Sequence, residues 1–138
     1  MKVFDMSTLD DLKPKVRAVE VQGTQFYVQA MSAQAQALYN AQGTRMAPLQ
    51  KIVDDPTMKV PTQKEGSAIA NEYADIMLSM TRIALMNGIV DADGNKIIKT
   101  ANQFARVYET LSPDVIDDLV MHITTQALDS EEKKESGE

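Results

Sequence analysis

The alternation of apolar and polar positions is most regular in residues 67–87, which directly precede Gly88. Apolar side chains recur there every three or four positions, the spacing that gathers them on one face of an α-helix. The residues of this face are Ile69, Tyr73, Ile76, Met77, Met80, Ile83 and Ala84, widened by Leu78, Leu85 and Met86. We therefore expect a long helix that is largely surrounded, either by its own chain or by a partner.

A different period governs residues 16–30, near the N-terminus. β-branched and aromatic side chains alternate with other residues on both sides of Gln22 and Gly23, and a glycine in such a turn can take a positive φ. The pattern predicts a β-hairpin with Phe26 and Val28 on its buried face. Because a lone hairpin is only marginally stable in water, we expect it to pack on helices or pair with another chain.

Capping residues and helical periodicity predict three further helices. Ser32, Thr100 and Ser112 are favourable N-cap residues for them. Gly43 would end the first of these helices, and Leu128 would lie at the end of the last. Their principal apolar residues are Leu38, Tyr39, Phe104, Val107, Tyr108, Leu111, Val115, Ile116, Leu119, Val120, Ile123 and Ala127.

Residues 44–66 follow neither period and contain Pro48, Pro56 and Pro61. We expect a loop here that carries one short amphipathic helix. A connection of this length is usually functional or mobile, so we interpret it as a mobile arm. The apolar residues of the short helix are Met46, Leu49, Ile52 and Val53.

The first fifteen residues form a polar lead. Ser7 followed by Asp10 resembles a capping box, which predicts one helical turn before Pro14. Five apolar residues of this lead are candidates for packing against the body, namely Val3, Phe4, Met6, Leu9 and Leu12.

Another polar turn lies between two short apolar pairs in residues 89–98 and predicts a second small hairpin or turn. Asp91, Asp93 and Asn95 have the spacing of the first three ligands of a calcium loop. Lys96, however, stands where that loop requires glycine, and its final glutamate is missing. We interpret the segment as a turn.

Together these elements predict a mainly α fold of the α+β class. It consists of an N-terminal β-hairpin followed by a small bundle of about four helices, with a short second hairpin or turn near residues 89–98. One α-rich domain would occupy residues 1–128 and include the arm at 44–66, and residues 129–138 would form a disordered acidic tail.

Charge and composition narrow the range of functions. The net charge is −6, but the last ten residues hold five acids and two lysines, so half of the excess lies in the tail. No basic patch is visible, and nucleic-acid binders need one to neutralise phosphate, so we expect no nucleic-acid partner. The longest predicted helix contains Glu72, Asp75 and Arg82, which argues against a membrane span. The first residues lack the apolar region of a secretory signal, and we expect a cytoplasmic protein.

Residues with catalytic chemistry are sparse. The absence of cysteine excludes disulfides, thiolate nucleophiles and sulfur ligands. His122 is the single histidine and has no second imidazole to complete a zinc site, so we interpret it as a helix-edge residue. The adjacent acid pairs are most simply solvated surface, and no glycine-rich phosphate loop occurs. We expect no enzyme, no cofactor and no metal site.

Methionine is the most suggestive residue type, with nine in the chain. The plainer interpretation is that the methionines of the central helix fill the core. The alternative is that their flexible side chains form an adaptable groove or a protomer interface. The candidate partner-binding residues are Met77, Met80, Leu85, Met86, Leu49 and Ile52.

The order of these segments resembles the tail assembly chaperone family of long-tailed, non-contractile phages. The resemblance is carried by residues 16–41 and 83–128. It consists of the hairpin followed by a serine-started helix, the long helix that enters an acidic glycine turn, and the short helix before the Leu-Ser-Pro-Asp-Val sequence at 111–115. The middle segment, residues 44–66, matches nothing in that pattern.

The resemblance implies a non-enzymatic assembly factor of the host cytoplasm. Such chaperones bind and solubilise the tape measure protein, assist assembly of the tail tube, and are absent from the mature virion. This chain would be the short form of a pair made by ribosomal frameshifting, in which the longer form mainly contacts the tail tube protein. Lys133 and Lys134 are compatible with a slippery codon run, and the nucleotide sequence would test this.

Self-association is also expected, since the chain has few large aromatic core residues. The hairpin edge or the 44–66 arm would reach a neighbouring copy. A structural phage tail or head–tail connector subunit is the alternative function, and it would remain in the virion. An acidic mimic of nucleic acid is disfavoured, because the charge gathers in the tail and not along a folded face.

Overall fold

The computed structural model describes residues 3–54 and 63–135 of the chain. Helices dominate it, with an antiparallel sheet near one end, which confirms the predicted α+β class. In chain order the elements are η1 (Met6–Leu12), β1 (Arg17–Val21), β2 (Thr24–Val28), α1 (Ala33–Asp54), α2 (Gln63–Gly88), β3 (Ile89–Val90), α3 (Ala101–Thr110) and α4 (Pro113–Glu135).

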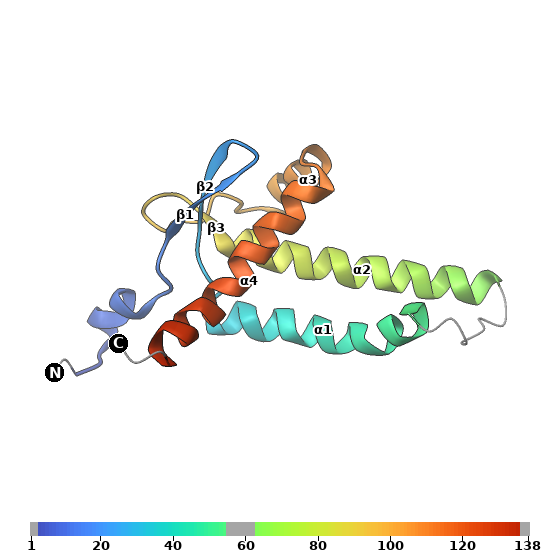
Figure 1. Cartoon of the computed structure of the whole chain (residues 1–138), viewed down its shortest axis with the longest axis horizontal. Coiled ribbons are helices and arrows are strands. Elements are labelled where there is room, and N and C mark those ends of the chain that lie inside the picture. Colours follow the sequence, from blue (N-terminus) through green and yellow to red (C-terminus); the bar gives the residue numbers. More distant parts are fainter. Residues whose placement is uncertain (1–2, 55–62, 136–138) are drawn as a thin grey trace.

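The two long helices α1 and α2 lie side by side along the longest axis of the molecule (Figure 1). α4 crosses this pair at a steep angle and packs against α2 and β1. The sheet and α3 lie at the end where α2 finishes. The C-terminal half of α2 is therefore the point where most of the other elements converge.

The hairpin at the N-terminal side is confirmed. β1 and β2 pair in register from Arg17 opposite Val28 to Val21 opposite Thr24. The two residues of the turn, Gln22 and Gly23, both have positive φ, 49° and 81°. This is the backbone of a two-residue turn that suits the twist of the strands.

A third strand extends the sheet in the order β1-β2-β3, also antiparallel. β3 pairs with β2 through Tyr27 opposite Val90, a contact that the sequence does not reveal. After β3 the chain turns back, and Val90 bridges to Lys96. The predicted turn near residues 89–98 is thereby confirmed, and it caps the edge of the sheet.

The core lies where the sheet, the end of α2, α3 and α4 meet. Its buried residues are Val21, Val28, Met31, Ala35, Ala84, Leu85, Ile89, Ile98, Phe104, Val115, Ile116, Leu119 and Ile123. Val28 lies in this core as predicted, while Phe26 is half-buried at its margin. α4 approaches α2 so closely that a Cβ on Gly88 would lie 2.6 Å from side-chain atoms of Ile123.

All three predicted N-caps are confirmed. The Ser32 hydroxyl accepts the amide of Ala35 at 3.2 Å, and the Thr100 hydroxyl accepts the amide of Gln103 at 3.1 Å. Gln103 also reaches back to the amide of Thr100, which completes a capping box. Ser112 accepts the amide of Val115 at a longer 3.5 Å. Local side-chain chemistry thus sets where these helices begin.

The predicted helix end at Gly43, and the loop after it, are wrong. α1 continues through Gly43 and Pro48 to Asp54, although a proline inside a helix removes a backbone hydrogen bond. Packing of α1 along α2 supports the extension. The hydroxyl of Tyr73 on α2 donates to Gln50 Oε1 at 2.7 Å, a link across this stretch. Residues 55–62 of the predicted arm lie outside the described residues, and its last four already belong to α2.

Two expectations about the ends of the chain also differ from the structure. The N-terminal helical turn is the 3-10 helix η1, and Asp5 caps it together with Thr8, where Ser7 and Asp10 were expected. None of the residues of η1 is buried, so its apolar side chains do not pack into the body. At the other end α4 runs to Glu135, into the segment expected to be a disordered tail.

Candidate functional site

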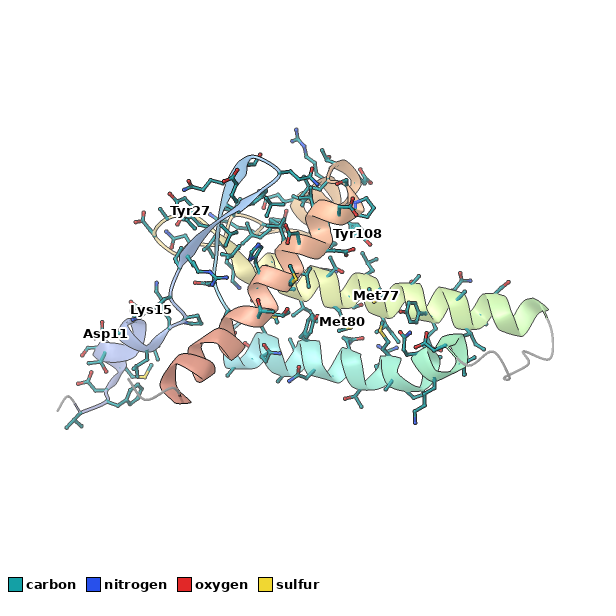
Figure 2. The ribbon with its side chains drawn as sticks, viewed as in Figure 1. Asp11, Lys15, Tyr27, Met77, Met80 and Tyr108 are labelled. Atoms are coloured by element: carbon teal, nitrogen blue, oxygen red, sulfur yellow. The ribbon has the colours of Figure 1, made fainter. Side chains whose placement is uncertain are left out.

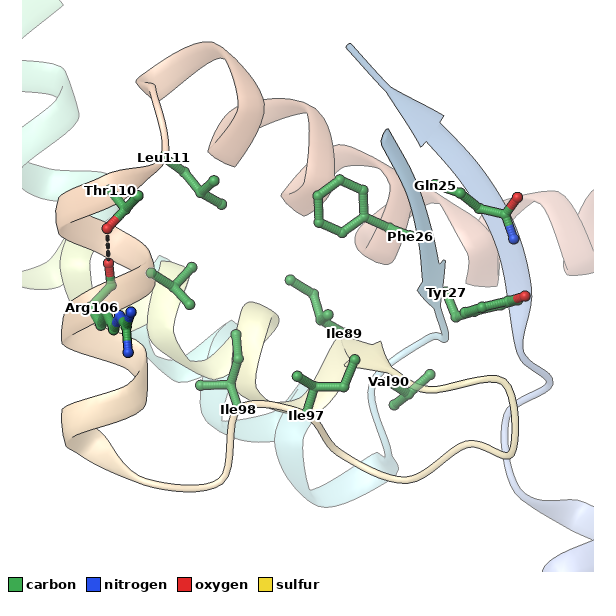
Figure 3. Close-up of a pocket in the computed structure, with 11 residues that line it drawn as sticks. Gln25, Phe26, Tyr27, Ile89, Val90, Ile97, Ile98, Arg106, Thr110 and Leu111 are labelled. Atoms are coloured by element: carbon green, nitrogen blue, oxygen red, sulfur yellow. Dashed lines mark hydrogen bonds between the residues drawn. The ribbon is translucent and has the colours of Figure 1, made fainter. Parts of the chain in front are cut away.

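An apolar groove separates the sheet from α3 (Figure 3). Its volume is about 460 Å³. The residues that line it are Gln25, Phe26, Tyr27, Ile89, Val90, Ile97, Ile98, Arg106, Val107, Thr110 and Leu111. Phe26 projects from β2 toward the α3 side, where Leu111 lies opposite. The groove has the size and apolar lining of a binding site, since protein pockets for ligands usually measure about 300–1,000 Å³.

The short helix α3 explains why this groove is open. Phe104 is its one buried residue, and its ring meets Tyr108 edge to face with centroids 5.5 Å apart. Val107 and Leu111 face the groove and are only half-buried. β3 is two residues long, so it does not extend far enough to cover them. Apolar side chains on both walls are therefore left without full cover.

Positive charge borders the groove. Arg106 is the one charged residue among those that line it. A second hollow of about 330 Å³ shares Ile98 with the groove and is lined by three further cations, Arg82, Lys96 and Lys99. Among the residues that the structure describes, no acidic one lines either of the two cavities. This local sign is notable in a chain whose net charge is −6.

A second candidate surface lies between α2 and α3. A hollow of about 370 Å³ is lined there by Leu78, Ser79, Arg82, Ala101, Phe104, Ala105, Tyr108 and Glu109. Leu78 and its neighbour Met77 are each 41 % exposed, and Tyr108 is nearly as exposed. Figure 2 shows Met77, Met80 and Tyr108 on these two helices. We call Met77, Leu78 and Tyr108 the outer apolar face, in which Leu78 and Tyr108 line this hollow and Met77 is the exposed residue next to Leu78 on α2.

The partner-binding residues expected from the sequence do not form one surface. Leu85 is fully buried in the core, so its assignment to a binding surface is wrong. Met86 packs against the core, which fits the plainer interpretation of the methionines. Of the four candidate residues on α2, Met77 alone is exposed, and Met80 is half-buried. The remaining two, Leu49 and Ile52, are half-buried on α1.

The acidic turn after β3 has a structural explanation. Asp91 Oδ1 accepts the amides of Asp93 at 2.9 Å and Asn95 at 3.0 Å. These hydrogen bonds hold the pKa of Asp91 below its usual 3.8, and the one from the Asn95 amide has the largest effect. The carboxylate is thus used to fix the turn. Among the described residues, no group of three or more histidine, cysteine or acidic side chains could hold a metal ion.

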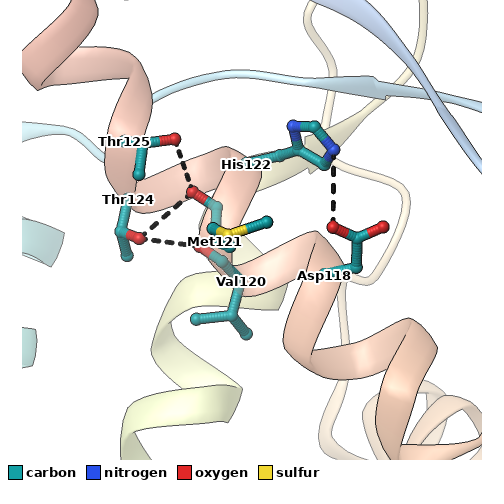
Figure 4. Close-up of polar contacts among 6 residues, drawn as sticks. All are labelled: Asp118, Val120, Met121, His122, Thr124 and Thr125. Carbon is teal, nitrogen blue, oxygen red and sulfur yellow. Dashed lines mark hydrogen bonds and ion pairs between the residues drawn. The ribbon is translucent and has the colours of Figure 1, made fainter.

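His122 lies at the edge of α4, as expected. Its Nε2 is 3.7 Å from Asp118 Oδ1, one helical turn away, and both side chains are partly exposed (Figure 4). On the same helix the hydroxyls of Thr124 and Thr125 donate to backbone carbonyls of the preceding turn. These polar contacts are local to α4.

In the described part of the chain no helix is both long and apolar enough to cross a membrane.

Comparisons with family models, with curated proteins and with solved structures find no match for this chain. The candidate surfaces above therefore have to be interpreted from their own residues. The groove between the sheet and α3 is not predicted by the sequence pattern, because it depends on the pairing of β3 with β2. The apolar stripe of α3 was the available signal: the helix of ten residues holds Phe104, Val107 and Tyr108, and Leu111 follows as its C-cap.

Proposed function

We propose that this chain is a tail assembly chaperone of a long-tailed phage. It binds and solubilises the tape measure protein, assists tail tube assembly, acts in the host cytoplasm, and is not kept in the mature virion. The resemblance in segment order supports this proposal. The observation that carries it in the structure is the outer apolar face, Met77, Leu78 and Tyr108, which lies outside the core.

The chemistry of this face suits a long helical client. An amphipathic helix binds in a groove through apolar side chains spaced three or four residues apart. The hollow between α2 and α3 offers Leu78 and Tyr108 to such a row, and Met77 adds a flexible thioether. Contacts of this kind are adaptable and weakly specific. Many copies on one client would gain avidity, so each contact can be modest.

Co-expression with the tape-measure-like protein encoded beside it tests the proposal. We expect the client to stay soluble and to co-purify with this chain. Met77→Glu combined with Leu78→Glu should reduce the recovered client at least about tenfold, because binding would then bury unpaired charge. Both side chains are already partly exposed, so the variant should keep its circular dichroism spectrum and melting temperature.

Met121→Glu is the matched control. Met121 is exposed on α4 and does not line the hollow between α2 and α3, so its substitution should leave client recovery unchanged. An insoluble client, or equal loss with the control, would contradict the assignment of this face. Mass spectrometry of purified virions then decides between the two functions: stoichiometric presence of this chain would identify a structural tail or connector subunit instead.

A further inference from the structure

The N-terminal segment, residues 3–12, is ordered but unpacked. Its apolar residues Val3, Phe4, Met6, Leu9 and Leu12 are between 49 % and 84 % exposed. The segment nevertheless has a defined shape, because the Asp5 carboxylate accepts the amide of Ser7 at 2.8 Å and Thr8 completes a capping box. Short 3-10 helices gain little from their own hydrogen bonds. An apolar and capped segment of this kind therefore has the features of an element that packs on another surface.

The groove between the sheet and α3 has the complementary features. It offers half-buried apolar walls, and the residues that line it and the hollow sharing Ile98 include four cations and no acid. The N-terminal segment carries three acids, Asp5, Asp10 and Asp11, and no base. Apolar contact in the middle and opposite charge at the rim are the usual composition of a protein interface.

We propose that the N-terminal segment of one copy docks into this groove on a second copy of the chain. The segment would supply the apolar residues that cover Phe26, Val107 and Leu111. Asp10 would approach Arg106 or one of the lysines beside Ile98. If the contact repeats in one direction it builds rings or filaments, and if two copies exchange segments it builds a dimer. This inference does not depend on the proposed chaperone function.

A second copy is favoured over the groove of the same chain. Figure 1 shows η1 and α3 on opposite sides of the sheet. The connecting residues 13–16 lie against the turn after β3, since Lys13 Nζ and Val16 Cγ2 would lie 3.5 Å and 3.4 Å from a Cβ on Gly94. This contact directs η1 away from α3. Docking within one chain would require its release, whereas docking between copies leaves it in place.

Sedimentation equilibrium over a wide concentration range tests the proposal with the full chain. We expect the average mass of the wild type to rise with concentration. The segment variant Phe4→Asp/Leu9→Asp and the groove variant Ile97→Glu should each weaken self-association by at least about tenfold, since each places a charge in an apolar contact. All three positions are at least 49 % exposed, so the fold itself should be unaffected.

A mixture of the two defective proteins provides the most specific test. The segment variant keeps an intact groove, and the groove variant keeps an intact segment. At a concentration where the wild type associates, each should be mainly monomeric alone, and together they should form a one-to-one complex. Leu38→Glu, at a position on α1 as exposed as Ile97, is the matched control and should associate like the wild type.

Charge reversal examines the rim of the same contact. Asp10→Lys and Arg106→Glu should each weaken association, and added salt should weaken it in the wild type. The proposal is overturned if the wild type stays monomeric at every concentration, if the mixed variants do not associate, or if Leu38→Glu is as disruptive as Ile97→Glu. Association that survives both charged variants would assign the interface to another surface, such as the free edge of β1.

Discussion

Between Ile76 and Gly88, α2 packs against β3 and α4 and contains buried residues, whereas between residues 66 and 75 no side chain of the same helix is buried. We call the first region the packed end. We call the second region, together with the facing part of α1, the arm; here the name means this pair of helices and not the loop predicted at 44–66. Apolar residues recur with the same helical spacing in both. Spacing therefore determines which face of a helix is apolar, and the number of elements that converge on it determines how deeply that face is buried.

The difference has a simple origin in the layers of the fold. At the packed end three kinds of element meet, namely the sheet, α2 and α4. In the arm α2 has α1 as its main neighbour, so the sides of the two helices that face away from each other are exposed. Stability should accordingly reside at the packed end, while the arm can vary in sequence or contact with less effect on folding.

Two leucine truncations should give the largest contrast. Leu85→Ala removes a fully buried side chain from the packed end and should lower the free energy of unfolding by about 2–5 kcal/mol. Leu49→Ala removes the same atoms from a half-buried position in the arm and should cost about 1 kcal/mol. Urea denaturation followed by circular dichroism measures both. Equal losses would mean that the arm is packed as tightly as the core.

Two glycine substitutions sharpen the comparison, because they should differ in sign. In Gly88→Ala the new Cβ would lie 2.6 Å from Ile123, a buried side chain of α4, so overpacking should cost about 1–3 kcal/mol. In Gly43→Ala the nearest atom is Met80 Cε at 3.8 Å, an ordinary contact. Since alanine favours the helix, this second variant should stabilise the protein by about 0.4–1 kcal/mol.

The cause of the first effect can be isolated with a double variant. If the contact with Ile123 is responsible, Gly88→Ala should cost less in an Ile123→Ala background than in the wild type, because truncation makes room for the Cβ. Urea denaturation of the single and double variants measures this coupling. Additive losses would assign the effect of Gly88→Ala to the helix end instead.

Local signals were sufficient for much of the fold. The hairpin follows from the positive-φ turn at Gln22 and Gly23, and the helix starts follow from side chains that cap their own amides. Both features are determined by residues a few positions apart. The continuation of α1 past Gly43 and Pro48 depends instead on α2, which is distant in sequence and outweighs the local preference of both residues.

The candidate surfaces were harder to predict for the same reason. Periodicity placed Leu85 and Met77 on one apolar helix but could not show that the sheet and α4 cover the first and leave the second exposed. The groove is made by β2, β3 and α3. It depends on the pairing of β3 with β2, and a strand of two residues is too short to give a clear sequence pattern for that pairing. Surfaces built from several elements depend on tertiary structure, which the residue pattern of a single segment does not encode.

The smallest predicted effect concerns the acidic turn at the packed end. Hydrogen bonds to the Asp91 carboxylate lower its pKa in the folded protein below the usual 3.8. The charge of Asp91 therefore contributes stability above this usual value, and the contribution is lost as the pH falls through the lowered pKa.

Asp91→Asn keeps an acceptor oxygen and removes the charge. The variant should be slightly less stable than the wild type at neutral pH and equal to it at pH values well below 3.8. Urea denaturation at both pH values measures this, and Asp75→Asn, at an exposed acid of the arm, controls for net charge. A stability difference that persists in acid would mean that the turn depends on the shape of the side chain and not on its charge, and that the packed end owes no pH dependence to this carboxylate.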